Sequence, residues 1–190
     1  MKILIDNGHG SNTAGKCSPL WKDGTQLFEW QHNRIIARRL HDKLTSLGYN
    51  SELIVPEERD ISLSERVKRV NDACKNEKCI FISIHCNAAG GHGWEVWTTT
   101  RKNNSDKLAK CFLDVFPKVF PDKELRGAKE RNYTVINDTN CPSVLTENFF
   151  MDTEDECHWL MTDDAINRIV ELHVLAIKKY HDQLFPSKML

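Results

Sequence analysis

The sequence predicts an α/β fold: one domain over residues 1–190, with a mostly parallel or mixed central sheet and helices on both faces. Three observations carry this prediction. The length suits a single hydrophobic core, and no linker-like segment divides the chain. Short β-branched runs alternate with longer stretches of helical periodicity. The composition, 40% hydrophobic and 28% charged, is that of an ordinary globular protein.

In the first third of the chain, a strand, a helix and a second strand are expected in that order. Residues 2–6 (KILID) form a short apolar run that ends at Asn7, which is typical of a buried strand. Residues 26–47 carry a helical pattern that ends before Gly48, a residue type common just beyond a helix. The segment 49–55 is expected to form the next strand.

The middle of the chain repeats this alternation. Residues 62–65 (SLSE) are a capping-box sequence, which predicts a helix running towards Cys74. The isoleucine-rich run 79–85 (CIFISIH) is typical of a fully buried strand. Residues 95–99 are a further expected strand, and Ser105 is expected to cap a helix through about Phe116.

The last third of the chain predicts a strand followed by helical segments. Residues 143–147 (SVLTE) begin just after a proline and are expected to form a strand. Thr153 and Glu156 form a second capping-box pattern. The final helix, about 163–184, places five apolar side chains on one face, namely Ile166, Ile169, Val170, Val174 and Ile177.

Charge and hydropathy exclude several classes of partner. The formal net charge of −1 offers no basic stripe for nucleic acid or an anionic membrane. No apolar run approaches the roughly 20 residues that span a bilayer. The N-terminus, MKILIDNGHG, is too short for a signal-peptide core, so we expect either synthesis in the cytoplasm without an export signal or removal of a leader. Nothing in the sequence implies an oligomer.

The seven cysteines indicate synthesis in a reducing compartment. None stands in a C-x-x-C pair, so neither a thiolate zinc site nor thioredoxin-like redox chemistry has support. Several lie inside apolar stretches, where a free cysteine acts as a small hydrophobic side chain. Disulfides are not required for a core of this size.

Three polar side chains stand where apolar strands finish. His9 follows the first strand by one short turn, His85 ends CIFISIH, and Glu147 ends SVLTE. In open α/β sheets, ligands bind beyond the carboxyl ends of the strands. If these strands run parallel, the three side chains converge at one edge of the sheet.

Glu29 is unusual because it falls on the apolar face of a predicted helix. At about 100° per residue, Ile36, Leu40 and Leu47 lie within roughly 20° of it. A buried carboxylate without a partner costs several kcal/mol, so Glu29 must be neutralised, paired or bound to a metal.

Two histidines and a carboxylate are a common ligand set for one catalytic zinc ion, with water at the fourth position. A second carboxylate, which need not bind the metal, then serves as general base towards that water. The chain has no H-E-x-x-H motif, so a thermolysin-like helix is excluded as the source of ligands.

Purely structural interpretations remain open for each of these residues. A histidine after a strand is more often a hydrogen-bonded structural residue than a ligand. Glu29 has an alternative partner in Arg66, and Glu147 could cap the turn that follows it. The remaining histidines are interpreted as structural or solvent-facing, with His173 in the core, and they are His32, His41, His92, His158, His173 and His181.

The motifs around these residues resemble those of the zinc-dependent N-acetylmuramoyl-L-alanine amidases. The opening D-x-G-H-G turn of that family matches residues 6–10, and its N-x-x-I-A-x-x-L helix pattern matches residues 33–40. Its L-x-x-R-x-x-x-x-N segment matches residues 63–71, and S-I-H-x-N-A matches residues 83–88. Its P-x-V-L-x-E-x-x-F strand matches residues 142–150.

The resemblance implies a function and a set of site residues. It implies that His9, Glu29 and His85 bind zinc and that Glu147 is the catalytic carboxylate. The substrate would be bacterial peptidoglycan, cut at the amide between N-acetylmuramic acid and L-alanine. The chain departs from the family pattern at Ser11, where a second glycine is usual, and at residues 151–152, where Ser-Asn is common. No separate cell-wall-binding module is expected.

Asn87 and Trp94 are predicted to contact the substrate. Asn87 stands beside His85, although a turn-forming asparagine explains it equally well. Trp94, together with Trp21 and Trp97, is a candidate platform for the sugar-peptide strand, although tryptophan in a domain of this size is more often part of the core.

Three other functions remain open. A related zinc peptidase or deacetylase acting on the cell wall would share the fold and ligands and would differ only in product. A non-catalytic peptidoglycan-binding module predicts a damaged site, whereas all four expected positions are intact. A phage lysis enzyme, released to the wall when the cell lyses, would share the chemistry and differ in biological role.

Overall fold

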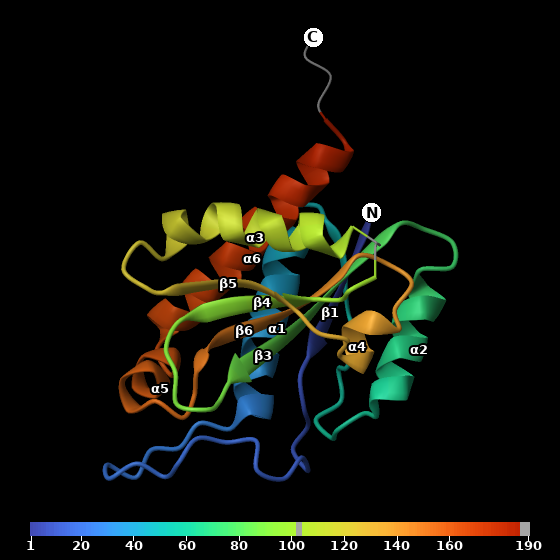
Figure 1. Ribbon diagram of the computed structural model, residues 1–190. Coiled ribbons are helices and arrows are strands. Elements are labelled where there is room, and N and C mark those ends of the chain that lie inside the picture. The colour runs from blue at the N-terminus through green and yellow to red at the C-terminus, as the bar shows by residue number, and fades with distance from the viewer. Residues whose placement is uncertain (102–103, 187–190) are drawn as a thin grey trace.

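The computed structural model describes residues 1–101 and 104–186, which form one sheet flanked by helices (Figure 1). The strands are β1 (Lys2–Asn7), β2 (Asn50–Leu53), β3 (Cys79–Asn87), β4 (Trp94–Thr98), β5 (Leu125–Glu130) and β6 (Ser143–Phe150). The helices are α1 (Glu29–Ser46), α2 (Leu63–Ala73), α3 (Ser105–Val119), α4 (Thr134–Asn137), α5 (Glu154–Leu160) and α6 (Asp163–Leu184).

The sheet has the strand order β2-β1-β3-β6-β4-β5. The first four of these strands are parallel, β4 runs antiparallel to β6, and β5 is parallel to β4. The predicted mostly parallel or mixed sheet is therefore confirmed. The carboxyl ends of β1, β3 and β6 lie at one edge, where the blue segment between β1 and α1 runs past them (Figure 1).

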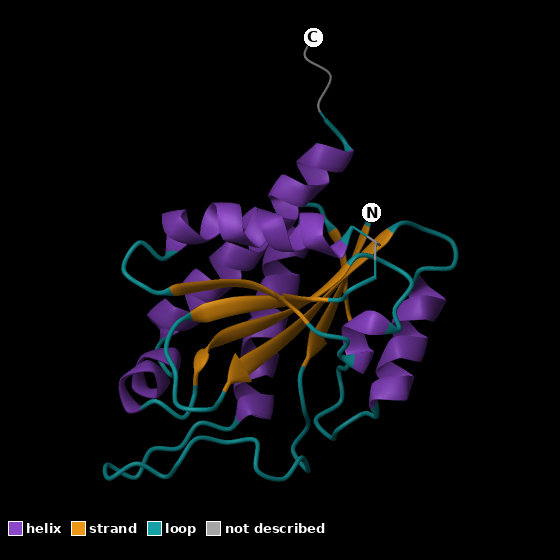
Figure 2. Ribbon diagram, in the orientation of Figure 1, coloured by secondary structure: helices purple, strands orange, loops and turns teal. Residues whose placement is uncertain are grey.

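Helices cover the two faces of this sheet unequally. α1, α3 and α6 pack on one face over the larger apolar core, which contains Ile82, Ile84 and Val144. α2 and α4 lie side by side on the other face, over a smaller core around Phe81 and Leu145 (Figure 2). Because α2 and α4 are short, the second face stays less covered, and the site lies on it. No helix among residues 1–101 and 104–186 is long and apolar enough to cross a bilayer.

Several predicted elements are confirmed close to their expected limits. The strand expected at 2–6 is β1, and the helix expected at 163–184 is α6. The Ser62 hydroxyl accepts from the Glu65 amide, as the capping-box sequence predicts. α1 begins at Glu29 rather than near residue 26, because the segment before it pairs with the Cys17 region.

Two predicted caps are wrong. Asn104, in the left-handed conformation, precedes α3, while Ser105 is its first residue and its hydroxyl accepts from the Ser143 amide. At α5, Thr153 occupies the predicted N-cap position, but its hydroxyl donates to the Gly91 carbonyl and makes no capping bond to the helix. The Glu156 carboxylate accepts from the amides of two residues outside the helix, Gly93 and Phe150. At both helices, the side chains expected to cap the helix instead form hydrogen bonds with residues outside it.

β5 and α4 were not predicted. β5 (LRGAKE) is an edge strand in which exposed and half-buried positions alternate, so it lacks the apolar run that identifies a buried strand. α4 is four residues long, which is too short for a helical period to be recognised. The failure to predict β5 matters, because Arg126 and Lys129 on this strand form ion pairs with Glu95 at the site.

His173 lies in the core, as predicted, between the sheet and α6. Its ring nitrogens lie 3.0 Å from the Thr146 hydroxyl and 2.8 Å from the Ile169 carbonyl oxygen. Burial lowers the pKa of His173 to about 4. As the pH falls, the unfolded chain binds a proton at this residue before the folded protein does. The stability contributed by neutral His173 is therefore present above pH ~6.5 and is lost as the pH falls towards 4.

Replacing His173 with Gln is expected to flatten the acid limb of the stability profile. In the wild type, protonation linked to this residue lowers the free energy of unfolding by about 3 kcal/mol as the pH falls from ~6.5 to 4. Urea unfolding across the same range checks it, with the exposed His92→Gln as control. Parallel pH profiles for the wild type and His173→Gln would contradict the assignment.

Candidate active site

A row of residues crosses the sheet near the carboxyl ends of the parallel strands. His85 on β3 is in register with Glu147 on β6, and Glu147 is in register with Glu95 on β4. Glu95 in turn stands opposite Gly127 on β5. Gly8, just after β1, lies beside the His85 ring at the other end of the row. The row thus joins two predicted site residues to a carboxylate, Glu95, that the sequence did not single out.

Three of the predicted residues form a cluster able to hold a metal ion. One ligand atom each from His9, Glu29 and His85 lies within 4.8 Å of the others. His85 Nδ1 is 3.1 Å from Glu29 Oε1, and His9 Nε2 is 3.3 Å from Glu29 Oε2. The two imidazole rings are perpendicular, with centroids 4.9 Å apart. Residues from β1's following turn, α1 and β3 therefore meet at one point.

The chemistry of this cluster fits a divalent metal. Glu29 is 1% exposed, and its Oε2 has no hydrogen-bond partner. Its Oε1 accepts from the Cys86 amide, which fixes the carboxylate in place. Arg66, the alternative partner, instead forms ion pairs with Asp6 and Asp60. A buried carboxylate between two imidazoles, with one oxygen that accepts no hydrogen bond, is a donor set that zinc binds.

The charges within the cluster are coupled. Burial opposes ionisation of Glu29, but the hydrogen bond and charge of His85 outweigh it, so the pKa of Glu29 is lowered. Burial likewise opposes protonation of His85, yet Glu29 raises the pKa of His85 overall. Burial lowers the pKa of His9 to about 4, which keeps its imidazole neutral and available as a metal ligand at neutral pH.

Glu147 stands beside this cluster without a hydrogen-bond partner for its Oε2 atom. Burial raises its pKa to about 7, with His85 acting in the opposite direction and the negative charges of Glu29 and Glu95 adding to the rise. Because the buried Oε2 atom accepts no hydrogen bond from the turn after β6, the alternative capping role has no support. A carboxyl group with a pKa near neutrality is suited to accept and return a proton.

Two arginines hold the backbone that carries His9. His9 adopts a positive φ of 66°, a conformation uncommon for a residue with a Cβ atom. Its carbonyl oxygen accepts from Arg34 Nη1 at 3.1 Å and from Arg66 Nη2 at 3.4 Å. Both arginines are buried, and sequence reasoning missed these contacts because they join residues 25 and 57 positions apart.

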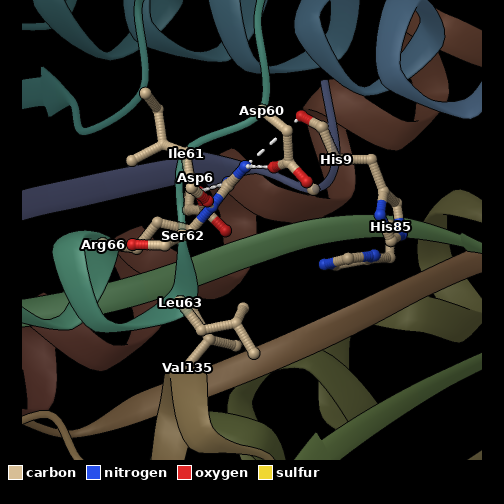
Figure 3. A pocket seen from close by; sticks show the side chains of 10 residues that line it. Asp6, His9, Asp60, Ile61, Ser62, Leu63, Arg66, His85 and Val135 are labelled. Atoms are coloured by element: carbon tan, nitrogen blue, oxygen red, sulfur yellow. Dashed lines mark hydrogen bonds and ion pairs between the residues drawn. The ribbon is translucent and has the colours of Figure 1, made fainter. Parts of the chain in front are cut away.

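A pocket of about 280 Å³ opens next to the two histidines. His9 and His85 lie on one side of it, and Arg66 with its two carboxylate partners lies on the other (Figure 3). Leu63 and Val135 complete the wall with apolar surface (Figure 3). The cluster is thus reachable from solvent along a partly apolar depression between β1 and α2.

Replacing Gly8 with Ala is expected to displace His85 and weaken metal binding. A Cβ atom at position 8 would lie 2.1 Å from Cε1 of His85, far inside contact distance. We expect affinity for Zn²⁺ to fall by roughly 10–100-fold, the usual cost of disturbing a ligand's support. Competition with a chromophoric chelator measures it, with exposed Ser11→Ala as control. Unchanged affinity would show that the ring has room to move.

The two residues predicted to contact the substrate, Asn87 and Trp94, lie in different surroundings. Asn87 lies near the row, where its amide donates to Glu95 at 3.1 Å and its oxygen accepts from the Ala88 amide. Trp94 is fully buried, stacked on Phe112 and bonded to Asn148, so its ring has no surface to offer a substrate. The platform interpretation of Trp94 is therefore wrong. The alternation of W-E-V-W puts Trp94 and Val96 on one face of β4, and the packing of that face in the larger core buries both side chains.

Trp21 and Trp97, the other two tryptophans considered as a platform for the substrate, are partly buried. Trp97 lies on the same face as Glu95, donates to that carboxylate at 2.9 Å and packs edge-on against Tyr133. Trp21 packs against the larger core, with its ring 6.1 Å from that of His158. Of these three tryptophans, Trp97 is the one that forms a hydrogen bond with a residue of the row across the sheet, Glu95.

Comparison with known proteins identifies the family. A family described as N-acetylmuramoyl-L-alanine amidase matches residues 3–179. An endolysin of Bacillus phage SPP1 is 27% identical over 98% of this chain and 70% of its own length. A sporulation-specific N-acetylmuramoyl-L-alanine amidase of Bacillus subtilis is 29% identical over 94% of this chain and 68% of its own.

Solved structures agree. The N-acetylmuramoyl-L-alanine amidase from Clostridium difficile 630 superposes with a TM-score of 0.83 at 26% identity, covering 98% of this chain and 97% of that one. The chain therefore belongs to the N-acetylmuramoyl-L-alanine amidase family.

Proposed function

We propose that this protein is a zinc-dependent amidase that hydrolyses the bond between N-acetylmuramic acid and L-alanine in peptidoglycan. One observation carries the proposal: His9, Glu29 and His85 offer three converging ligand atoms, and Glu147 lies on the neighbouring strand in register with His85. A metal-binding triad with a second carboxylate beside it is an arrangement that supports metal-assisted amide hydrolysis.

Each residue has a separate task in this proposal. His9, Glu29 and His85 hold one zinc ion, which when bound activates water and polarises the carbonyl of the scissile amide. Glu147 takes a proton from the attacking water and returns it to the leaving amine of alanine. Burial raises the pKa of this carboxyl group above its ordinary value, which favours uptake of the proton that is then returned to the leaving amine.

The place of action follows from the substrate. The relatives include a phage endolysin and a sporulation-specific amidase, both of which match most of this chain. We infer that this protein acts on the bacterial cell wall, with the glycan-peptide strand as its partner. The pocket beside the histidines would admit one part of that strand.

Digestion of purified peptidoglycan tests the proposal. Zinc-loaded protein is expected to release new alanine amino termini without new reducing sugar ends, and chelation is expected to abolish the release. Intact peptidoglycan in the presence of bound zinc would contradict the assigned substrate. New termini at another residue, or released acetate, would instead indicate the related peptidase or deacetylase.

A further inference from the structure

Glu95 is the centre of a charged group that the proposed chemistry does not use. It is 2% exposed and lies on the same row as the proposed general base. Its Oε1 accepts from Asn87 and Trp97, and its Oε2 accepts from Arg126 Nε at 2.7 Å and Lys129 Nζ at 2.5 Å. Both oxygens are therefore fully used.

The group carries more positive than negative charge. Arg126 and Lys129 bring two cations to one carboxylate, and their side chains stay 30% and 34% exposed. The bonds to Glu95, with one from Arg126 Nη1 to the His92 carbonyl, leave part of the guanidinium and two ammonium hydrogens facing outward. A net positive, solvent-reachable pair of donors is suited to an anion.

Aromatic rings hold the two cations in position. The Arg126 guanidinium lies over the Phe150 ring at 4.9 Å, and the Lys129 ammonium lies 5.3 Å from the Trp97 ring centroid. Gly127 has a φ of 91° and stands opposite Glu95, beside a register shift that skips Arg126. This bulge lets the Arg126 side chain reach the same Glu95 oxygen as Lys129, which lies two residues beyond Gly127. The donors are thus oriented before any ligand arrives.

The distance from the metal cluster suits a peptide. Neighbouring strands lie about 4.8 Å apart, so Glu95, two strands from His85, is about 10 Å from it. An extended peptide advances about 3.3–3.6 Å per residue, so two residues span about 7 Å. The long Arg126 and Lys129 side chains can cover the remaining distance to the carboxylate of the second residue.

We propose that Arg126 and Lys129 form a subsite for a free carboxylate on the stem peptide, one residue beyond the alanine whose amine is released. This inference rests on the proposed function. Glu95 acts as a positioning residue that anchors both cations, and the subsite makes the enzyme selective for stems with an unmodified carboxylate over stems in which it is amidated.

The test compares two N-acetylmuramoyl peptides that differ only at the second residue, with its carboxylate free or converted to the primary amide. We expect the zinc-loaded wild type to cleave the acid with a higher kcat/KM. In Lys129→Met and Arg126→Gln, the acid-to-amide ratio of kcat/KM is expected to fall about tenfold. Lys129→Arg is expected to restore it.

Lys118→Met, an exposed lysine on α3, is the control and is expected to keep the wild-type ratio. A wild-type ratio near one, or an equal loss on both substrates in the variants, would overturn the subsite while leaving the amidase assignment intact. Failure of the wild type to cleave either peptide, with peptidoglycan also untouched, would overturn the proposed function and the subsite with it.

Discussion

Replacing Glu147 with Gln is expected to lower kcat by about 10²–10⁴-fold while zinc stays bound. The substitution keeps the shape of the side chain but removes its ability to accept a proton. None of the three proposed ligand atoms belongs to this residue, so the metal content is expected to match that of the wild type. The fold should also persist, because Glu147 Oε2 makes no hydrogen bond that the variant would lose.

Release of alanine amino termini from peptidoglycan, measured together with metal content, checks this prediction. Glu171→Gln, an exposed carboxylate on α6, serves as the matched control. Turnover within a few-fold of the wild type in Glu147→Gln would remove this residue from the proton transfer. Loss of zinc in the same variant would instead move it into the ligand set.

Replacing His85 with Ala is expected to abolish both zinc binding and hydrolysis. The variant loses one of three ligand atoms, and the Glu29 carboxylate loses its 3.1 Å contact with the imidazole. Disturbing only the support of a ligand costs about 10–100-fold in affinity, so we expect deletion of the ligand to cost more than 100-fold. Glu29 would then be buried without its principal partner, which also lowers stability.

Zinc content after dialysis, with a thermal unfolding scan, measures both effects. His92→Ala is the control, because the His92 side chain is exposed and its ring pairs with Asp155 on the surface. Stoichiometric zinc in His85→Ala would exclude this residue as a ligand. If the variant is folded and zinc-free but adding excess zinc restores activity, the ligand assignment stands and the loss is one of affinity.

The proposed catalytic residues were recognisable from the sequence because their signals are local. His9, His85 and Glu147 each follow an apolar run, and that pattern alone marked them. The strand ends expected at residues 85 and 147 were wrong, because β3 continues to Asn87 and β6 continues to Phe150. Glu29 was recognisable because a carboxylate on an apolar helix face needs a partner. The helical count predicted Leu47 on the same buried face, yet Leu47 is 52% exposed, since α1 ends at Ser46 and the periodicity ends with it.

The supporting residues around the site were not recognisable in the same way. Glu95 stands between two apolar residues in the sequence, and only its register opposite Glu147 places it at the site. Arg34 and Arg66 come from two different helices and meet at one carbonyl oxygen. Such contacts depend on how distant segments are aligned, and a single sequence carries no local pattern for that alignment.

The sequence by itself determined the α/β class, the strands β1, β3 and β6, the helix α6 and the four polar residues at the sheet edge, because hydrophobic periodicity and strand ends are written in neighbouring residues. Only the tertiary structure decided that β4 and β5 reverse direction, that Trp94 is buried, and that Arg126 and Lys129 reach the row beside Glu147. The direction of β4 and β5 depends on how distant segments pair in the sheet. The placement of the side chains depends on strand register, because a shift of one residue would turn every side chain to the opposite face.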